Sequence, residues 1–327
     1  MATRRVLTAL AAVALLAVVV VWMAGCGRDG GAGAAATLPK AALMDTFEGR
    51  PALAGATDRV AGRLVVRETG PLRQKLTFEM SNRGDGSRIT AFDESHTQQL
   101  HVIAVSSDLS QFVHEHVEKA ARDGTLIADV TFPTAGLYHV YADVTPRGIG
   151  QQVLRFDVPV GGEGSGDTDQ AGALSLSPHE VSAGPYTVRI DPSALRAGQS
   201  GEMRLSILRN GQPASDLAPY LGAGAHVVLV AADDLSFVHV HPDAHGDDAE
   251  AGGHAHSSTD RHGQRGMDHS GHGAHGAKRG DAVATGSVSA EMALHVEPPR
   301  PGRYAMWVEF SGGSEVRRAS FVIDVPN

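Results

Sequence analysis

One segment of this chain occurs twice, and this repetition constrains the fold more than any other feature of the sequence. Residues 100–116 read LHVIAVSSDLSQFVHEH, and residues 225–241 read AHVVLVAADDLSFVHVH. Each copy contains an apolar run, an Asp-containing turn, a Phe and a His-x-His pair. The chain therefore contains two copies of one domain, and its 327 residues leave room for both.

Short apolar runs separated by turn residues predict the fold class. Runs of about four to eight residues, rich in Val, Ile, Leu, Tyr and Phe, recur along both copies, and Gly, Pro, Asn and Asp separate them. No long stretch of helical periodicity follows the N-terminal segment, which argues against an enzyme fold of alternating strands and helices. We expect an all-β chain of two tandem immunoglobulin-like β-sandwiches with about seven strands each.

Composition predicts the domain boundaries. A second Gly-rich stretch separates the two copies, and the second copy is longer because it contains a polar insertion rich in His and Gly. We expect this insertion to be disordered, because it has too few apolar side chains to form a core. The predicted segments are a signal peptide at 1–25, a flexible tether at 26–54, a first sandwich at 55–160, a linker at 161–172 and a second sandwich at 173–327, with the insertion at 242–282.

The N-terminus has the form of a targeting segment. Arg4 and Arg5 precede an apolar run from Val6 to Val21, and Met-Ala-Gly-Cys follows at residues 23–26. This tetrapeptide resembles a bacterial lipobox, although Met23 departs from the usual Leu or Val. We expect cleavage before Cys26, lipid on its sulfur and an extracytoplasmic body anchored to the cell membrane. The alternative is an uncleaved N-terminal membrane anchor, since the apolar run approaches the ~18 residues that a span needs.

The cysteine count and the charge restrict the chemistry. Cys26 is the only cysteine, so a lipidated protein has no thiol left for a disulfide, a thiolate metal site or a cysteine nucleophile. Because no thiol is left, any bound metal must be held by His, carboxylate or Met side chains.

The formal net charge is −9 and no basic patch is present, which argues against nucleic acid as a partner.

Each repeat carries the same pattern of three histidines, one in an apolar strand and a His-x-His pair that begins 13 residues later. Side chains alternate faces along a strand, so both members of a pair point the same way and can converge on one ion. The first histidine lies on the preceding strand, where a third ligand is needed. Three imidazoles around one ion are a known arrangement for Cu(II) or Zn(II). The predicted ligands are His101, His114 and His116 in the first copy and His226, His239 and His241 in the second.

Two further histidines of the first copy could also contribute to this site, and the repeated histidines could instead have a structural role. His96 and His139 lie on segments of the first copy that could reach the same area, but Leu221 and Ala305 stand at the matching places of the second copy. The alternative is structural, because a duplication copies structural histidines as faithfully as ligands. A histidine within an apolar strand is often neutral and hydrogen-bonded to the backbone.

The insertion is the second histidine-rich feature. His-rich tracts are typical of metal binding, and residues 267–272, Met-Asp-His-Ser-Gly-His, resemble the Met- and His-rich tails of bacterial copper-handling proteins. Imidazole and thioether ligands together favour copper over magnesium or calcium. The alternative is a variable loop whose composition has drifted. The predicted ligands here are His245, His254, His256, His262, Met267, His269, His272 and His275.

Several pieces of both copies match a known domain group. In the second copy they are Asp216–Gly222, Ala225–Val227, Asp234–Pro242 and Pro301–Tyr304, and the first copy keeps His-Val at 101–102 and Phe-Val-His-Glu-His at 112–116. Each repeat thereby resembles the secreted YtkA-like domains, an immunoglobulin-like group often met among bacterial metal-handling proteins, and is more distantly similar to the copper-resistance C family. The first copy departs from the pattern, since it lacks the Pro-Tyr-Leu-Gly piece. The resemblance implies an extracytoplasmic β-sandwich that handles copper or another transition metal.

We therefore expect a membrane-anchored metal-binding lipoprotein rather than an enzyme. Its metal would be copper, with zinc as the alternative, for storage, delivery or resistance, and its partner a membrane metal transporter or a metalloenzyme. A second hypothesis is a structural or adaptor module that docks a membrane protein through strand edges. A remote third is an enzyme similar to copper–zinc superoxide dismutase, since His-Gly-Asp follows at 245–247. Its bridging histidine and further ligands cannot be assigned here, and no second cysteine is present.

Overall fold

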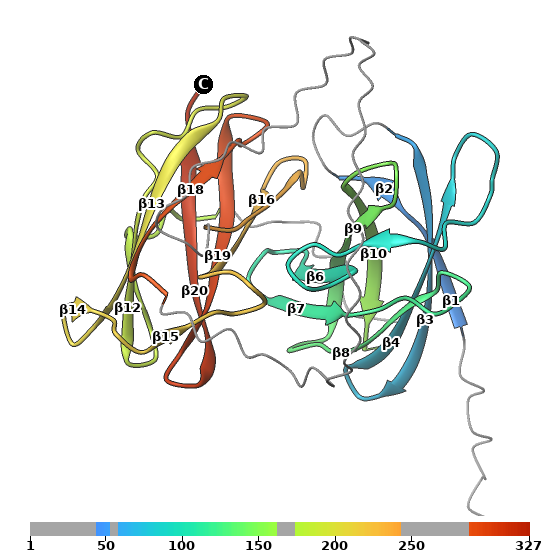
Figure 1. Ribbon diagram of the computed structural model, residues 1–327, viewed down its shortest axis with the longest axis horizontal. Coiled ribbons are helices and arrows are strands. Elements are labelled where there is room, and N and C mark those ends of the chain that lie inside the picture. Colours follow the sequence, from blue (N-terminus) through green and yellow to red (C-terminus); the bar gives the residue numbers. More distant parts are fainter. Residues whose placement is uncertain (1–43, 53–57, 162–173, 243–287) are drawn as a thin grey trace, which may run out of the picture. The chain divides into compact units, whose positions relative to one another are not determined.

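The computed structural model describes residues 44–52, 58–161, 174–242 and 288–327. Every regular element within these ranges is a β-strand, and all strand pairs are antiparallel, which confirms the prediction of an all-β chain of two tandem sandwiches (Figure 1). Within the described ranges, no helix has the length and apolar character needed to cross a membrane. The signal peptide, the linker from residue 162 and the insertion from residue 243 lie outside the described residues.

The first repeat forms two facing sheets. One has the order β1-β3-β4-β8, and the other has the order β2-β10-β9-β6-β7, with β5 paired to β9. Buried residues of both sheets, among them Leu64, Phe78, Val102 and Tyr138, form one hydrophobic core. The strands are β1 (Met44–Glu48), β2 (Arg50–Pro51), β3 (Val60–Gly70), β4 (Arg73–Asn82), β5 (Phe92–Asp93), β6 (Leu100–Ser106), β7 (Phe112–Val117), β8 (Leu126–Thr131), β9 (Gly136–Pro146) and β10 (Gln152–Val160).

The second repeat has the same plan. One sheet has the order β11-β12-β13-β14 with β18 paired to β13, and the other has the order β15-β19-β16-β17 with β20 paired to β19. Its core is separate from that of the first repeat. The strands are β11 (Glu180–Ala183), β12 (Tyr186–Asp191), β13 (Gly201–Arg209), β14 (Gln212–Pro213), β15 (Leu217–Ala218), β16 (His226–Ala231), β17 (Phe237–Val240), β18 (Glu291–Val296), β19 (Gly302–Gly312) and β20 (Glu315–Val325).

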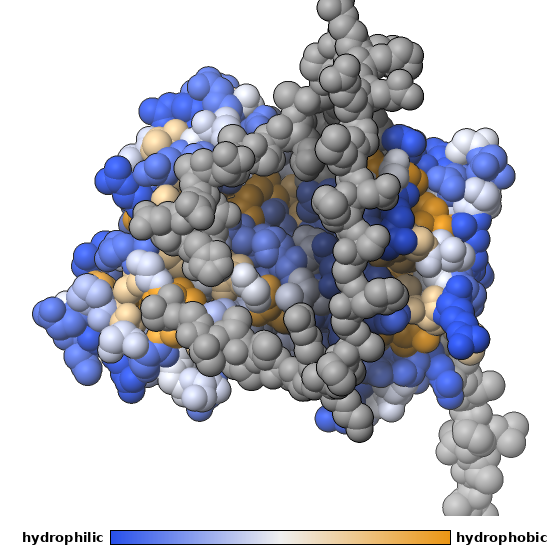
Figure 2. Space-filling view, in the orientation of Figure 1, coloured by the Kyte–Doolittle hydropathy of each residue, from blue (hydrophilic) through white to orange (hydrophobic). Residues whose placement is uncertain are grey.

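The burial pattern of the strands follows from their sequences. In β8 and β18 buried and exposed residues alternate, as expected for strands with one face on a core and one in water. The outward edges of both sandwiches are accordingly mostly hydrophilic (Figure 2). In contrast, every residue of β6 and β16 is buried, because the second face of each strand packs against the other sandwich. The continuous apolar runs of the duplicated segment therefore reflect burial on two sides.

A third apolar cluster joins the two sandwiches. Phe112 of β7 stacks on Trp307 of β19, and Phe237 of β17 stacks on Tyr141 of β9, both with ring centroids 4.8 Å apart and ring planes 22° apart. Aromatic pairs of this kind contribute about 0.5–1.5 kcal/mol beyond the area they bury. The hydroxyl of Tyr141 also donates to the carbonyl oxygen of Leu235 at 3.0 Å. Each repeat thus presents equivalent residues to the other.

The first sandwich begins earlier than the sequence predicts. Residues 44–51 fall within the expected tether at 26–54, yet they form β1, which pairs with β3, and β2, which pairs with β10. Four of the five residues of β1 are exposed, so the segment shows no alternation of apolar and polar residues. Partly buried Phe47 is its contact with the core. Its place in the sheet depends on backbone pairing, which a hydrophobicity pattern does not reveal.

Candidate metal centre

The six histidines of the duplicated pattern lie where the two sandwiches meet. In the first repeat His101 on β6 is directly opposite His116 on β7, and His114 is two residues from His116 on the same face. In the second repeat His239 on β17 pairs with Val228 of β16, two residues from His226. His101 and His226 are each only 1% exposed. The hairpin register therefore brings each predicted set of three together.

The nitrogens within each set have the spacing of metal ligands. In the first repeat His114 Nε2 lies 3.4 Å from His101 Nδ1 and 3.0 Å from His116 Nε2. In the second repeat the corresponding distances, from His239 Nε2 to His226 Nδ1 and to His241 Nε2, are 3.4 and 3.0 Å. Nitrogens bound at 2.0–2.1 Å in a tetrahedral site are about 3.3 Å apart. Each set thus fits around one ion.

Backbone carbonyls fix the orientation of the first histidine in each set. His101 Nε2 lies 2.9 Å from the carbonyl oxygen of Ser95, and His226 Nε2 lies 3.0 Å from that of Tyr220. A carbonyl oxygen only accepts hydrogen bonds, so Nε2 carries the proton in both rings. The Nδ1 lone pair of a neutral ring is then free to bind a metal, and it faces the other histidines of its set.

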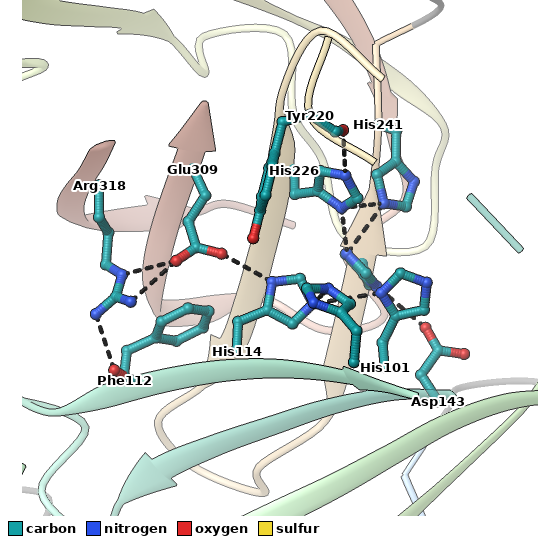
Figure 3. A network of polar contacts seen from close by, with 11 residues as sticks. His101, Phe112, His114, Asp143, Tyr220, His226, His241, Glu309 and Arg318 are labelled. Atoms are coloured by element: carbon teal, nitrogen blue, oxygen red, sulfur yellow. Dashed lines mark hydrogen bonds and ion pairs between the residues drawn. The ribbon is translucent and has the colours of Figure 1, made fainter. Parts of the chain in front are cut away.

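A carboxylate from the opposite sandwich holds the central histidine of each set. Glu309 of β19 accepts from His114 Nδ1 at 2.8 Å, and Asp143 of β9 accepts from His239 Nδ1 at 3.1 Å (Figure 3). The side chains of His114 and His239 are each 1% exposed. Carboxylate partners of this type orient metal-ligating histidines and raise their basicity. The Nε2 atoms of both central rings are thereby directed to the centre.

The two sets are close enough to be one cluster. The ligand atoms of His101, His114, His226 and His239 all lie within 4.8 Å of one another, and they could hold a metal ion. Rings from opposite repeats approach to centroid distances of 5.1 Å between His101 and His239 and 5.4 Å between His114 and His239. The predicted ligands on β6, β7, β16 and β17 therefore meet in a single place.

The cluster favours neutral imidazole, the form that binds metals. Burial, assisted by the charges of neighbouring histidines, lowers the pKa of His116 and of His226 to about 2. Burial lowers the pKa of His101 to about 4, although its hydrogen bond to Ser95 opposes the change. The same causes hold the pKa of His239 and of His241 well below the usual value. Metal binding at neutral pH therefore displaces few protons from these rings.

The two carboxylates have different surroundings. Burial raises the pKa of Asp143 to about 7, and only the hydrogen bond from Gln151 opposes it. Burial also disfavours the charged form of Glu309, but His114 and the guanidinium of Arg318 outweigh it and hold the pKa of Glu309 below its usual value. Arg318 lies 2.9 Å from Glu309 and donates to the carbonyl oxygen of Phe112 (Figure 3). The two halves of the cluster are thus alike in geometry but not in charge.

Of the two additional histidines considered from the sequence, one lies at the cluster. The ring of His96 packs on His241 with centroids 3.5 Å apart. His139 instead pairs with Asp157 on β10, its Nδ1 2.7 Å from the carboxylate. The predicted ligands His245, His254, His256, His262, Met267, His269, His272 and His275, and the lipidation site Cys26, lie outside the described residues.

The histidine pattern did not predict the two carboxylates. Asp143 and Glu309 stand at matching positions of two mostly apolar strands, YHVYADV and YAMWVEF. Both are buried, with exposures of 6% and 3%. Ionisable side chains are rarely buried without a partner, so an acidic residue repeated in a buried strand was a signal that could have identified them.

One known family model matches most of the chain. The family model described as Domain of unknown function (DUF8832) matches residues 58–162 and 179–327, one region on each sandwich. No curated protein matches the chain. The resemblance to YtkA-like and copper-resistance domains gains no support from these matches and stays a prediction.

Proposed function

The chain belongs to the DUF8832 family, and from this premise we propose that it is a transition-metal-binding protein whose metal is held where its two sandwiches meet. One observation carries the proposal. The lone pairs of four buried imidazoles face one another, because carbonyl oxygens or carboxylates take the opposite nitrogen of each ring. Purely structural histidines would not need lone pairs directed at one another within hydrogen-bond distance, whereas metal ligands do.

The ligand chemistry supports copper, with zinc as the alternative. All ligands of the cluster are imidazoles, and three imidazoles on one ion suit Cu(II) and Zn(II). Copper stands above zinc in the Irving–Williams order for a nitrogen site. The Met and His residues of the insertion add to this preference by composition. We propose that the insertion captures ions weakly and raises their concentration near the buried site.

The cellular role is proposed from the sequence. The basic and apolar residues before Cys26 support export and lipidation, so that the sandwiches are held at the outer face of a membrane. A protein in that place with a buried imidazole site is suited to storage, delivery or resistance, with a membrane metal transporter or a metalloenzyme as its partner.

Metal content of purified variants tests the proposal. Asn at positions 114 and 239 can keep the hydrogen bonds to Glu309 and Asp143 but removes the ligand nitrogens. After copper loading and removal of loose ions with a weak chelator, elemental analysis should find tightly bound metal in the wild type and none attributable to the interface in His114→Asn/His239→Asn. The matched control is His179→Gln/His295→Gln, which changes two exposed histidines away from the cluster.

Deletion of residues 243–287 separates the interface from the insertion. We expect the deletion variant to keep its tightly bound metal and to lose only weak binding. If all tight binding disappears with the insertion, or persists in His114→Asn/His239→Asn, the interface histidines are structural and the adaptor hypothesis replaces the metal site.

A further inference from the structure

We infer that the two histidine sets form one dinuclear centre, with an ion on each set and both ions inside the same buried interface. This inference rests on the proposed function and goes beyond it, because a metal-binding interface could equally hold a single ion shared by the two repeats. The ligands are His101, His114 and His116 for one ion and His226, His239 and His241 for the other.

The number and spacing of the nitrogens favour two ions. A tetrahedral ion takes four ligands, so one ion cannot use all six imidazoles. In the second set all three nitrogens lie 2.8–3.4 Å from one another, the spacing of ligands on a common ion. In the first set the central nitrogen, on His114, lies 3.4 and 3.0 Å from those of His101 and His116. A single ion bound by His101, His114, His226 and His239 would leave out His116 and His241, although their Nε2 atoms lie 3.0 Å from the central histidines.

The separation of the sets places the two ions close together. Four ligand atoms, two from each set, lie within 4.8 Å of one another. Ions in two-metal sites are about 3.5–4 Å apart, a distance that this arrangement accommodates. Three protein ligands leave one position open on each ion, and water or hydroxide completes the coordination. The buried carboxylates of Asp143 and Glu309 offset part of the added positive charge.

The crossed carboxylates make each histidine set depend on the opposite repeat. His114 is oriented by Glu309 of the second sandwich, and His239 is oriented by Asp143 of the first. Neither set is therefore complete within its own repeat. Replacing a partner of this type costs about 10–100-fold in metal affinity. Glu309→Gln should accordingly lower the affinity for the ion held by His101, His114 and His116, although residue 309 belongs to the other repeat.

Copper(II) titration of the full chain, followed by electron paramagnetic resonance, tests the inference. The variants are His101→Gln/His114→Asn for the first set and His226→Gln/His239→Asn for the second, in which Gln can keep the bond to the backbone carbonyl. Because the insertion is present in every protein, its weak sites cancel when variants are compared. We expect each variant to lose one tightly bound ion. We also expect the wild-type spectrum to show spin coupling, as lost intensity or a half-field signal, and each variant to show one uncoupled ion.

Other results of this titration would distinguish a failure of the proposed metal binding from a failure of the dinuclear centre. If neither variant loses tightly bound copper, the proposed function itself fails. If the wild type binds one ion and both variants lose it, the protein binds metal in a single shared site and the dinuclear inference is overturned. Two ions without spin coupling in the wild type would also overturn it, since they would be two independent sites.

Discussion

Mild acid should destabilise the metal-free protein, because its buried histidines resist protonation. Burial lowers the pKa of His101 from 6.5 to about 4. Between these two values the unfolded chain binds a proton that the folded protein does not bind. The contribution of His101 to stability is therefore complete above pH 6.5 and is lost as the pH falls toward 4.

The loss can be estimated from the pKa values. Between pH 7 and pH 5, a histidine with this change in pKa loses about 2 kcal/mol of its contribution to the free energy of unfolding. His226, with a pKa of about 2, stays neutral in the folded protein throughout this interval and loses a similar amount. Together the two histidines weaken the fold by about 4 kcal/mol. Asp143, whose pKa is raised to about 7, takes up a proton in the folded protein over the same interval and offsets about 2 kcal/mol of this loss. The remaining loss is still a noticeable part of the ~5–15 kcal/mol typical of a folded protein.

Urea unfolding of chelator-treated protein at the two pH values measures this loss. His101→Gln, which has no titrating group at this position, should reduce the difference between pH 7 and pH 5 by about 2 kcal/mol. His295→Gln, on the exposed face of β18, is the matched control and should keep the wild-type difference. A wild-type difference below about 1 kcal/mol, or an unaltered difference in His101→Gln, would refute the argument from burial.

Three further outcomes are expected. Trp307→Ala should destabilise the protein by about 3–5 kcal/mol in urea unfolding, because it removes the buried partner of Phe112. An effect below about 1 kcal/mol would mean that the contact between the sandwiches adds little to the free energy of unfolding. Gly124→Ala should lower the melting temperature more than Gly148→Ala, since a Cβ at Gly124 would lie 2.2 Å from a backbone oxygen and both glycines have positive φ. Equal losses would contradict this. Copper at about 100 times its Kd should add about 2.7 kcal/mol to the free energy of unfolding for each tightly bound ion, and a strong chelator should reverse the gain; no change would mean that copper does not prefer the folded state.

The fold and the meeting of the histidines could be predicted from the sequence because their signals are local. Strand periodicity, the repeated turn and the His-x-His spacing each depend on neighbouring residues, and the register of β6 with β7 confirmed that the three histidines meet. Every residue of β6 is buried, and the apolar run from Val102 to Val105 within it is typical of a strand that is covered on both faces. It could not show which surface covers the second face.

The remaining features depend on contacts between distant parts of the chain. Asp143 lies 96 residues from His239, and Glu309 lies 195 residues from His114. No spacing rule connects such positions, and the packing of one sandwich on the other had to be known first. The same holds for the stacking of Phe112 on Trp307, which joins residues of different repeats.

The crossed contacts are those of an isologous dimer, in which the same patch of each subunit meets itself across a two-fold axis. Here both subunits are covalently joined, so the partner is always present and assembly does not depend on concentration. Because the two repeats are joined in one chain, their sequences do not have to be identical. Arg318 faces Glu309 on one side, whereas Val153 faces Asp143 on the other, and only the second half received the histidine-rich insertion. A homodimer would have to carry each such change twice, whereas this chain can specialise one half of its centre and leave the other unaltered.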